Sequence, residues 1–201
     1  MTSSSDPRRY GDPKTRQRIL DVTRELLVER GSALRLQEVA NRARVSRQGL
    51  YLHFGDRQHL ILALVRHMDE TLRLDEQLAH VYAAESGVEL LRRALRLNTE
   101  FWAKVAPVAI VMIGHQGEDD ALRAAWRDRM THRRGTFRRM AERLDELGEL
   151  APPWNVDSAG DLLYAVTHFD AWRELTGELG WSDDRYVETM SSLLEPALLV
   201  T

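Results

Sequence analysis

Apolar residues recur every three or four positions along most of the chain, which is the spacing of one face of a helix. Ile19, Val22 and Leu26 show this in the first such segment, and Gly31 follows it as a helix stop. Proline, glycine and capping residues separate the segments, and the sequence contains neither a hairpin signal nor an internal repeat. The pattern predicts an all-α fold of about nine helices, at residues 13–30, 35–42, 46–54, 56–81, 86–105, 107–114, 119–148, 156–179 and 183–199.

The second and third predicted helices are short and are joined by only the three residues 43–45. Ser46 is a good N-cap for the third helix, because its hydroxyl can accept a hydrogen bond from a free N–H of the first turn. Two short helices joined by a tight turn form a helix-turn-helix pattern. The long fourth helix, from residue 56 to about 81, would begin in this head and end in a larger helical body.

The helix that follows Ser46 has two faces of different character. Leu50 and Phe54 are expected to hold it against the first two helices. Arg47 and Gln48 stand on its first turn, and in a major groove arginine can pair with guanine and glutamine with adenine. Gly49 lets the helix approach a base closely, which gives a reason for a residue that costs about 1 kcal/mol in a helix.

Three further polar residues are placed for the DNA backbone. Tyr51 and His53 lie at the boundary between the two faces, and Arg57 stands on the first turn of the next helix. All three can donate hydrogen bonds to phosphate oxygens. Taken singly, each could instead be a solvated surface residue, and Tyr51 could be a half-buried packing residue.

The distribution of charge favours the DNA-binding interpretation. The 201 residues carry a net charge of −3. Residues 1–60 hold 12 Lys and Arg against 7 Asp and Glu, a net of +5, and the remaining residues hold 16 against 24, a net of −8. A basic head on an acidic body indicates that the head binds a polyanion. Arg8 and Arg9, in an arm expected to be disordered, could also reach DNA.

Composition and motifs exclude several other classes. There is no cysteine, which excludes a disulfide framework and a cysteine nucleophile and fits a cytoplasmic protein. We see no apolar run of membrane-spanning length, no secretory signal, no P-loop and no nucleotide fingerprint. Residues 114–120 (GHQGEDD) contain hard metal ligands, but a loop and an acidic helix start explain them better. We therefore expect no enzyme, no cofactor, no metal and no membrane partner.

A second basic run, at residues 129–139, has a different explanation. Met130 and Phe137 belong to an apolar stripe formed by residues 122, 126, 130, 137, 140, 144 and 147. Arg134 and Arg138 are expected to point outward. This predicts a solvated face with helix ion pairs rather than a second nucleic-acid site.

Residues 15–67 resemble the DNA-binding domain of the TetR (tetracycline-repressor-like) transcriptional regulators. The resemblance is carried by Ile19-Leu20, Leu26-Leu27, Val39-Ala40, Ala43-x-Val45-Ser46, Leu50-Tyr51-x-His53-Phe54 and Arg57-x-x-Leu60. It implies a homodimeric, ligand-responsive regulator, a repressor released from a pseudo-palindromic operator by a small effector bound inside the body. It also implies that the last two helices pair with those of a second copy as a four-helix bundle.

The sequence departs from the family pattern at three places. Arg44 stands where the turn usually has Gly, so either this residue accepts a less comfortable backbone or the turn differs slightly from that of the family. Arg35 stands where Thr or Ser commonly caps the second helix, although it could still contact a phosphate. Gln48-Gly49 replaces the common Gly-Thr or Gly-Ala, so no operator sequence can be transferred from relatives.

The residues and the resemblance together predict three functional sets. The DNA-binding set is Arg35, Arg44, Ser46, Arg47, Gln48, Gly49, Tyr51, His53 and Arg57. The ligand-binding set, for a small, largely apolar or aromatic effector, is Trp102, Met112, His115, Trp126, Phe137, Tyr164, His168, Phe169 and Trp172. The dimer-interface set is Leu162, Leu163, Val166, Tyr186, Val187, Met190, Leu194 and Leu198. Members of the last two sets could instead be plain core.

The expected organisation is an arm at residues 1–12, a helix-turn-helix domain at 13–60 and an effector-binding and dimerisation domain at 61–201. Two alternatives to the ligand-responsive regulator remain open. One is a DNA-binding regulator without a small-molecule effector, controlled by its abundance or by a partner protein. The other is an enzyme with a site near His115 in the acidic body.

Overall fold

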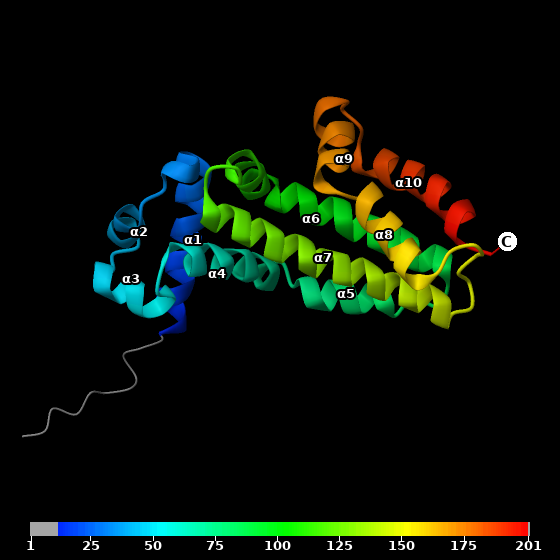
Figure 1. The fold of residues 1–201 in the computed structure, drawn as a ribbon, viewed down its shortest axis with the longest axis horizontal. Coiled ribbons are helices and arrows are strands. Elements are labelled where there is room, and N and C mark those ends of the chain that lie inside the picture. The colour runs from blue at the N-terminus through cyan, green and yellow to red at the C-terminus, as the bar shows by residue number, and fades with distance from the viewer. Residues whose placement is uncertain (1–11, 201) are drawn as a thin grey trace, which may run out of the picture. The chain divides into compact units, whose positions relative to one another are not determined.

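The computed structural model describes residues 12–200 (Figure 1). The predicted arm, with Arg8 and Arg9, falls almost entirely outside them. Every regular element in the described part is helical, which confirms the all-α prediction. The elements are α1 Pro13–Arg30, a 3-10 turn Gly31–Ala33, α2 Leu36–Arg42, α3 Arg47–Phe54, α4 Arg57–Thr71, α5 Leu74–Tyr82, α6 Gly87–His115, α7 Asp120–Glu146, α8 Val156–Val166, α9 Phe169–Arg173, a π turn Glu174–Glu178 and α10 Asp183–Leu198.

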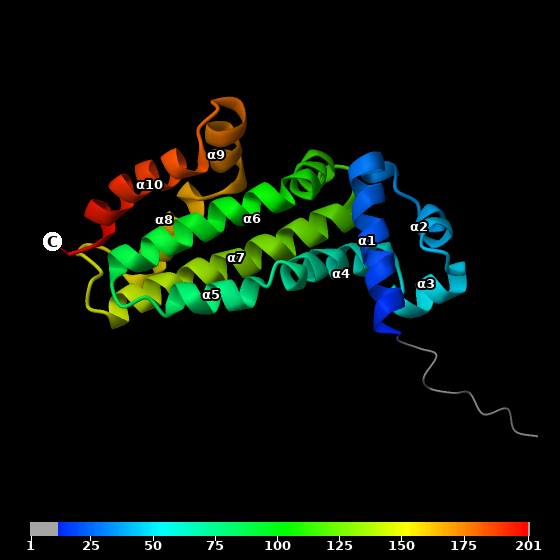
Figure 2. The same ribbon diagram turned by 180° about the vertical axis from the view of Figure 1, so that it is seen from behind.

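The described residues form two compact units. Unit 1 holds the chain up to Thr71 together with Pro107–Arg129, and unit 2 holds Leu72–Ala106 together with the chain from Met130 onward. In unit 1, α2 and α3 lie beside α1, and α1 packs against α4 (Figure 1). In unit 2, the α6 and α7 segments run side by side, with α8 and α10 alongside (Figure 2).

The predicted long helix at residues 56–81 is wrong, because it is divided into α4 and α5. Arg73 adopts a left-handed conformation, with φ 52°, and ends the first of them. The buried face changes across the break: Leu64 and Met68 face inward on α4, and Leu74 and Leu78 face inward on α5. In an unbroken helix these two pairs would point about 80° apart at 100° per residue. The break lets both pairs be buried.

The predicted break between residues 105 and 107 is also wrong, because α6 runs through Pro107. The apolar face keeps its phase on both sides, with Val105, Val108 and Met112 buried. Pro107 and Ala103, whose carbonyl loses its intrahelical partner, are both exposed to solvent. The missing hydrogen bond therefore lies where water can replace it.

The predicted single helix at residues 156–179 is also wrong, because it is divided into α8, α9 and the π turn. Its first part, α8, ends at Thr167, whose hydroxyl donates to the carbonyl oxygen of Leu163 at 2.6 Å. His168 then caps α9, and Nδ1 of its ring accepts from the N–H of Asp170 at 3.5 Å. None of the described helices is both long and apolar enough to cross a membrane.

Candidate functional site

The start of α3 is fixed by the cap that the sequence predicts. The Ser46 hydroxyl accepts a hydrogen bond from the N–H of Gly49 at 2.9 Å. A methyl group at Gly49 would lie 3.2 Å from this hydroxyl oxygen, so the missing side chain also has a local reason within the helix. Gly55, with φ 76°, ends the helix, and its N–H bonds to the carbonyl oxygen of Tyr51 at 2.7 Å.

The inward face of α3 is the one expected. Leu50 and Phe54 are both buried. The Arg16 guanidinium of α1 lies 5.3 Å from the centre of the Phe54 ring, which adds a cation–π contact between the two helices. Hydrophobic burial on this side leaves the opposite side of α3 free to meet a ligand.

The outward face of α3 is formed by Arg47, Gln48, Tyr51 and Leu52, all exposed. The Arg47 guanidinium lies 5.5 Å from the centre of the Tyr51 ring and donates to its hydroxyl at 3.4 Å. The ring therefore supports the guanidinium beside the first turn of the helix. Leu52 is 54% exposed and was not among the predicted residues. Because Leu52 lies four residues after Gln48, helical spacing alone could have placed it on the same face.

The turn before α3 confirms the expectation for Arg44. This residue has φ 54°, the left-handed conformation that Gly adopts more easily. The N–H of Val45 bonds back to the carbonyl oxygen of Ala40 at 3.0 Å, closing the end of α2. At the start of α2, Arg35 makes no side-chain cap, and its N–H donates instead to the Glu38 carboxylate at 3.2 Å. Both arginine side chains are exposed.

The two remaining predicted DNA contacts differ in their surroundings. His53 is partly exposed, and its ring lies beside Phe54 with centroids 6.0 Å apart. Arg57 donates from Nη1 to the Asp119 carboxylate at 2.7 Å, within unit 1. Burial raises the pKa of Asp119. The hydrogen bonds from Arg57 and from the N–H of Leu122 act in the opposite direction and outweigh burial, so the pKa of Asp119 is lowered overall. The structure thus gives Arg57 an intramolecular partner that the sequence did not reveal.

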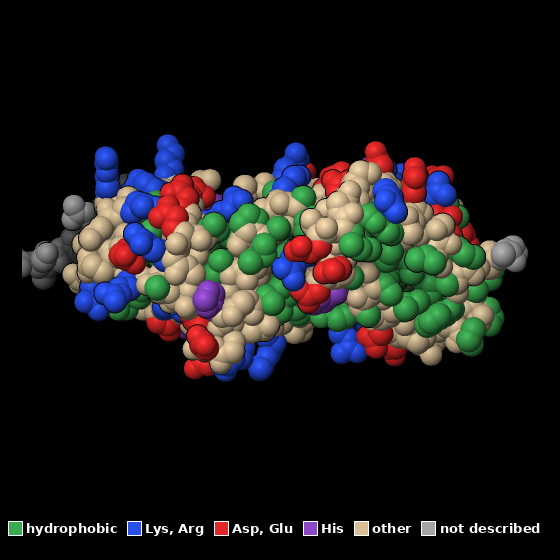
Figure 3. Space-filling view, turned by 90° about the horizontal axis from the view of Figure 1, so that it is seen from above, with side chains coloured by type: hydrophobic (Ala, Val, Ile, Leu, Met, Phe, Trp, Pro, Cys, Tyr) green, Lys and Arg blue, Asp and Glu red, His purple; other side chains and the backbone are tan. Residues whose placement is uncertain are grey.

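In unit 1, Lys and Arg side chains project from the surface over α1, α2 and α3, with some Asp and Glu side chains among them (Figure 3). The exposed arginines around α3 include Arg35, Arg44 and Arg47. A helix that presents Arg, Gln and Tyr side chains in the middle of such a surface has the dimensions and the donors to lie in a major groove.

Unit 2 contains a second candidate site, which is built around Arg133. This residue is only 6% exposed, although it is charged. Its guanidinium donates to the carbonyl oxygens of Tyr164 at 3.0 Å and Thr167 at 2.6 Å, at the C-terminal end of α8. It also donates to the Asn98 side-chain oxygen at 2.9 Å. One cation therefore joins α6, α7 and the negative end of the α8 dipole.

Aromatic rings cover this guanidinium. It lies 4.5 Å from the centre of the Phe137 ring and 5.3 Å from those of Trp102 and Tyr164. Further rings extend the group, with Trp102 and Phe169 at 5.0 Å, Phe169 and Trp172 at 5.8 Å, and Tyr164 and His168 at 5.9 Å between centroids. We call Arg133, Asn98 and these six aromatic residues the arginine cluster.

Six of the nine predicted ligand-binding residues belong to this cluster, and Arg133 itself was missed. The signal was present in the sequence. Position 133 lies three residues after Met130 and four before Phe137, on the stripe that faces the core. The prediction that Arg134 and Arg138 point outward is confirmed, since they pair with Asp161 and Asp157.

The other three predicted ligand-binding residues, Met112, His115 and Trp126, belong to unit 1. His115 lies against Gly31, where an added methyl group would come within 2.9 Å of its Nε2 atom. The start of α7 explains Asp119, whose carboxylate caps the helix by accepting from the N–H groups of Ala121 and Leu122. In the part of the chain that the structure describes, no group of three His, Asp or Glu residues could hold a metal ion.

A groove of about 500 Å³ lies between α5 and α6 in unit 2. Leu72, Val81 and Leu97 form its apolar lining, and charged side chains, among them Arg93 and Arg96, stand at its mouth. None of the predicted ligand-binding residues lines it. Both arginines have partners within unit 2, because Arg93 pairs with Glu89 and Arg96 with Asp184.

Two groups in or near the arginine cluster have shifted pKa values. Burial, and then the charge of Arg133, lower the pKa of His168, so this imidazole is neutral at pH 7. Burial raises the pKa of the Tyr186 hydroxyl to about 12, with the charge of Arg133 acting in the opposite direction. The surroundings of Arg133 therefore disfavour a second cation.

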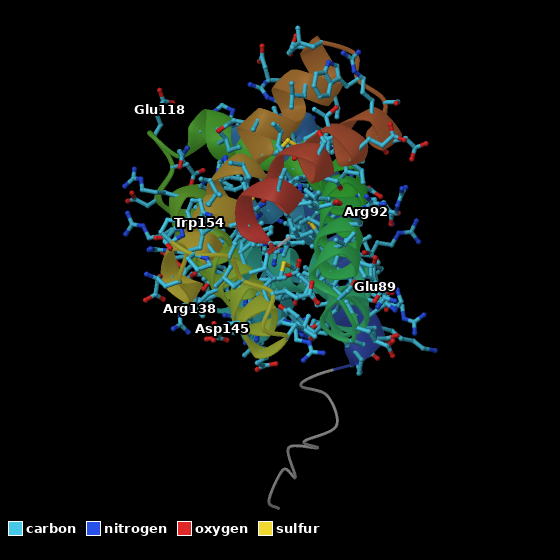
Figure 4. All side chains as sticks on the ribbon, turned by 90° about the vertical axis from the view of Figure 1, so that its right-hand side faces the viewer. Glu89, Arg92, Glu118, Arg138, Asp145 and Trp154 are labelled. Atoms are coloured by element: carbon cyan, nitrogen blue, oxygen red, sulfur yellow. The ribbon has the colours of Figure 1, made fainter. Side chains whose placement is uncertain are left out.

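The predicted dimer residues are divided between the core and the surface. Leu163, Tyr186, Val187, Met190, Leu194 and Leu198 are buried within the chain. Leu162 and Val166 are partly exposed on α8, and Leu193 of α10, which was not predicted, is 60% exposed. Hydrophobic side chains form a patch over α8 and α10 (Figure 3). Arg92 points outward from α6 (Figure 4) and pairs with Glu195 of α10.

Residues 19–64 match the family described as bacterial regulatory proteins, tetR family. No curated protein sequence matches the chain. The match covers all of α2 and α3 and most of α1 and α4, so it contains the exposed α3 surface and the cap that positions it.

Solved structures share the fold over nearly the whole chain. A transcriptional regulator from Saccharomonospora viridis in complex with choline has a TM-score of 0.70 and 19% identity, over 94% of this chain and 99% of that one. A TetR-family regulator from Rhodococcus sp. has a TM-score of 0.72 and 18% identity, over 91% and 97%. The regulator FadR from Bacillus subtilis in complex with stearoyl-CoA has a TM-score of 0.70 and 15% identity, over 88% and 96%.

Proposed function

We propose that this chain is a TetR-family DNA-binding transcriptional regulator, and that it is a homodimeric repressor released from its operator when it binds a small molecule. The observation that carries the proposal is the division of α3 between a buried face and an exposed one. Leu50 and Phe54 hold the helix to the head, and Arg47, Gln48 and Tyr51 face outward. The DNA-binding residues are proposed to be Arg35, Arg44, Ser46, Arg47, Gln48, Gly49, Tyr51 and His53.

In the proposed complex, Gln48 reads an adenine and Arg47 reads a guanine or a neighbouring phosphate. Two heads of a dimer would occupy successive major grooves, about 34–36 Å apart, on a pseudo-palindromic operator. The effector favours a shape of the dimer whose heads no longer match that spacing. It can act in this way only if it binds the two shapes with unequal affinity.

The outer face of α8 and α10 supports the homodimer. Leu162, Val166 and Leu193 leave an apolar patch that a second copy would cover, and such patches mark interaction sites on soluble proteins. The buried members of the predicted set, such as Leu194 and Leu198, would support this patch from beneath. At one end, the Trp154 indole N–H donates to the carbonyl oxygen of Ala197 at 2.6 Å, which ties the start of α8 to α10 (Figure 4).

The regulatory ligand is the second part of the proposal. Its support is the arginine cluster in unit 2, where a buried polar centre is lined by aromatic rings, a composition typical of small-molecule sites. Fold neighbours with 15–21% identity were solved in complex with choline, stearoyl-CoA and isovaleryl coenzyme A. The alternative regulator, which has no small-molecule effector, would keep the same α3 surface and would show no ligand-dependent release.

Selection of genomic fragments by the purified full chain, followed by footprinting, tests the proposal. A protected pseudo-palindrome with half-sites one helical turn apart is expected, and Arg47→Ala should lose protection while keeping the helical circular dichroism of the wild type. An Arg24→Ala variant, changed on α1 and outside the proposed contacts, is the matched control. No protected sequence under conditions where the chain is folded and dimeric would reject the function.

A further inference from the structure

Unit 2 contains buried polar groups that the fold does not satisfy, and one of them belongs to the arginine cluster. In the part of the chain that the structure describes, Asn98 Nδ2, the Tyr186 hydroxyl and the Ser191 hydroxyl are buried and make no hydrogen bond. All three residues are more than nine-tenths buried. A buried donor without a partner costs about 1–3 kcal/mol, so native structures keep few of them, and those that remain call for an explanation.

The orientation of Asn98 shows which kind of ligand atom its unpaired group can bind. Its side-chain oxygen takes a hydrogen bond from Arg133 at 2.9 Å, so its amide N–H donors point elsewhere. The Thr167 hydroxyl also accepts from Arg133, at 2.7 Å, and donates to the carbonyl oxygen of Leu163. These acceptors near the guanidinium are therefore used within the fold, and the unpaired amide nitrogen of Asn98 next to it can donate.

Donors beside a buried guanidinium favour an oxygen acceptor, and most of all one with a negative charge. The charge of Arg133 acts to lower the pKa of the Tyr186 hydroxyl, against the larger effect of burial. The same positive charge opposes an ammonium group. Apolar surface is also within reach, because Trp102 lies one turn after Asn98 on α6 and Phe137 lies one turn after Arg133 on α7.

We propose that Asn98, Arg133 and Tyr186 recognise the carboxylate of the effector, and that the aromatic side chains of the arginine cluster hold its apolar part. The effector class is therefore a small aliphatic or aromatic carboxylic acid. This inference rests on the proposed function only in calling the acid an effector, since the binding site itself can be tested without DNA. The α5–α6 groove is less suited, because the arginines at its mouth already pair with acidic residues of unit 2.

The first test uses the full-length protein and Tyr186→Phe, which removes one donor and no ring. The probes are benzoate, phenylacetate, hexanoate and decanoate, each paired with the amine and the primary amide of the same skeleton. Thermal shift identifies binders, and calorimetry measures their Kd. At least one acid should bind, its amine should not, and Tyr186→Phe should weaken that acid roughly tenfold, the loss expected for a hydrogen bond to a charged group. Tyr82→Phe, whose hydroxyl makes a long 3.4 Å contact to Thr136, is the control and should stay within twofold.

The ligand-free variants give an independent readout. If the Tyr186 hydroxyl is unpaired, Tyr186→Phe should have a higher Tm than the wild type. If the hydroxyl has a structural hydrogen-bond partner, the variant should have a lower Tm. Asn98→Asp is the second variant. Its side chain has nearly the same shape as asparagine and puts a carboxylate against the Arg133 guanidinium. This variant should have a higher Tm than the wild type and should no longer bind the acid. Circular dichroism confirms that each variant is folded.

The inference is overturned if no acid binds, if the amines or amides bind as well as the acids, or if Tyr186→Phe binds the acid as tightly as the wild type. The same proteins are assayed for binding to the selected DNA. DNA binding without acid binding would reject this inference and leave the proposed regulator standing. Acid binding by a chain that selects no DNA would support the site and reject the regulator.

Discussion

Breaking the ion pair between Arg57 and Asp119 should destabilise unit 1 by more than a surface pair would. The two groups meet at 2.7 Å, with side chains 24% and 9% exposed, so they lie between the exposed and the buried case. Exposed pairs contribute about 0–1 kcal/mol, and removing one partner of a buried pair costs about 3–5 kcal/mol. We expect a coupling free energy of about 1–2 kcal/mol between the two residues.

Asp119 has a second role, which the experiment must separate from the first. Its carboxylate also caps α7, and losing a cap costs about 1 kcal/mol. A double-mutant cycle of Arg57→Ala and Asp119→Ala, followed by urea unfolding at pH 7, cancels the cap contribution and leaves the pair. Asp120 and Arg123, an exposed pair on the same helix, form the control cycle, which should give less than about 0.5 kcal/mol.

The pH dependence supplies a further check of the same pair. The pKa of Asp119 is lowered in the folded chain, so its contribution is present above the unfolded value of about 3.9 and is lost as the pH falls through the folded value. Acid destabilisation should therefore be smaller in Asp119→Ala than in the wild type. A coupling free energy no larger than that of the control cycle would refute the reasoning.

Because Arg57 is held by Asp119, the salt slope of DNA binding in Arg57→Ala should equal that of the wild type. A slope lower by about 1 would reveal a phosphate contact instead.

Three other predictions concern separate parts of the chain. Gly31→Ala should cost about 1–3 kcal/mol in urea unfolding, because φ is 58° and the methyl would meet His115, whereas Gly114→Ala, a helical position with open space, should be neutral or stabilising. Tyr186 is raised to a pKa of about 12, so the wild type should lose about 1.4 kcal/mol of stability between pH 9 and pH 11, and Tyr186→Phe should lack that loss. Leu193→Asp should give monomers in analytical ultracentrifugation, and a dimer unchanged in affinity would place the interface elsewhere.

The head could be predicted from the sequence because its signals are local. Ser46 is three residues from the N–H it caps, and Leu50 and Phe54 are one helical turn apart, so capping and periodicity define α3 without knowledge of the rest. The less comfortable backbone at Arg44 was expected from the resemblance, because the family usually has Gly at this position. Arg57 differs, because its partner is 62 residues away and no local pattern reveals a contact at that separation.

The body was harder to predict because its breaks and contacts depend on packing. Proline is usually a reliable break signal, yet Pro107 stays within α6, where the apolar face continues and the unpaired carbonyl faces water. Arg73 carries no such signal but ends α4, and only the shift of the buried face between Met68 and Leu74 indicates the break. Arg133 occupies a core position despite its charge because carbonyl groups of α8 are there to receive it.

The central claim is that α3 reads DNA sequence through its exposed face. The most direct measurement compares the wild type with Gln48→Ala on the selected operator and on a scrambled duplex of equal length, by fluorescence anisotropy at fixed salt. If Gln48 contacts a base, the variant should lose about 1–3 kcal/mol on the operator and nothing on the scrambled duplex. Unchanged discrimination between the two duplexes would contradict the claim.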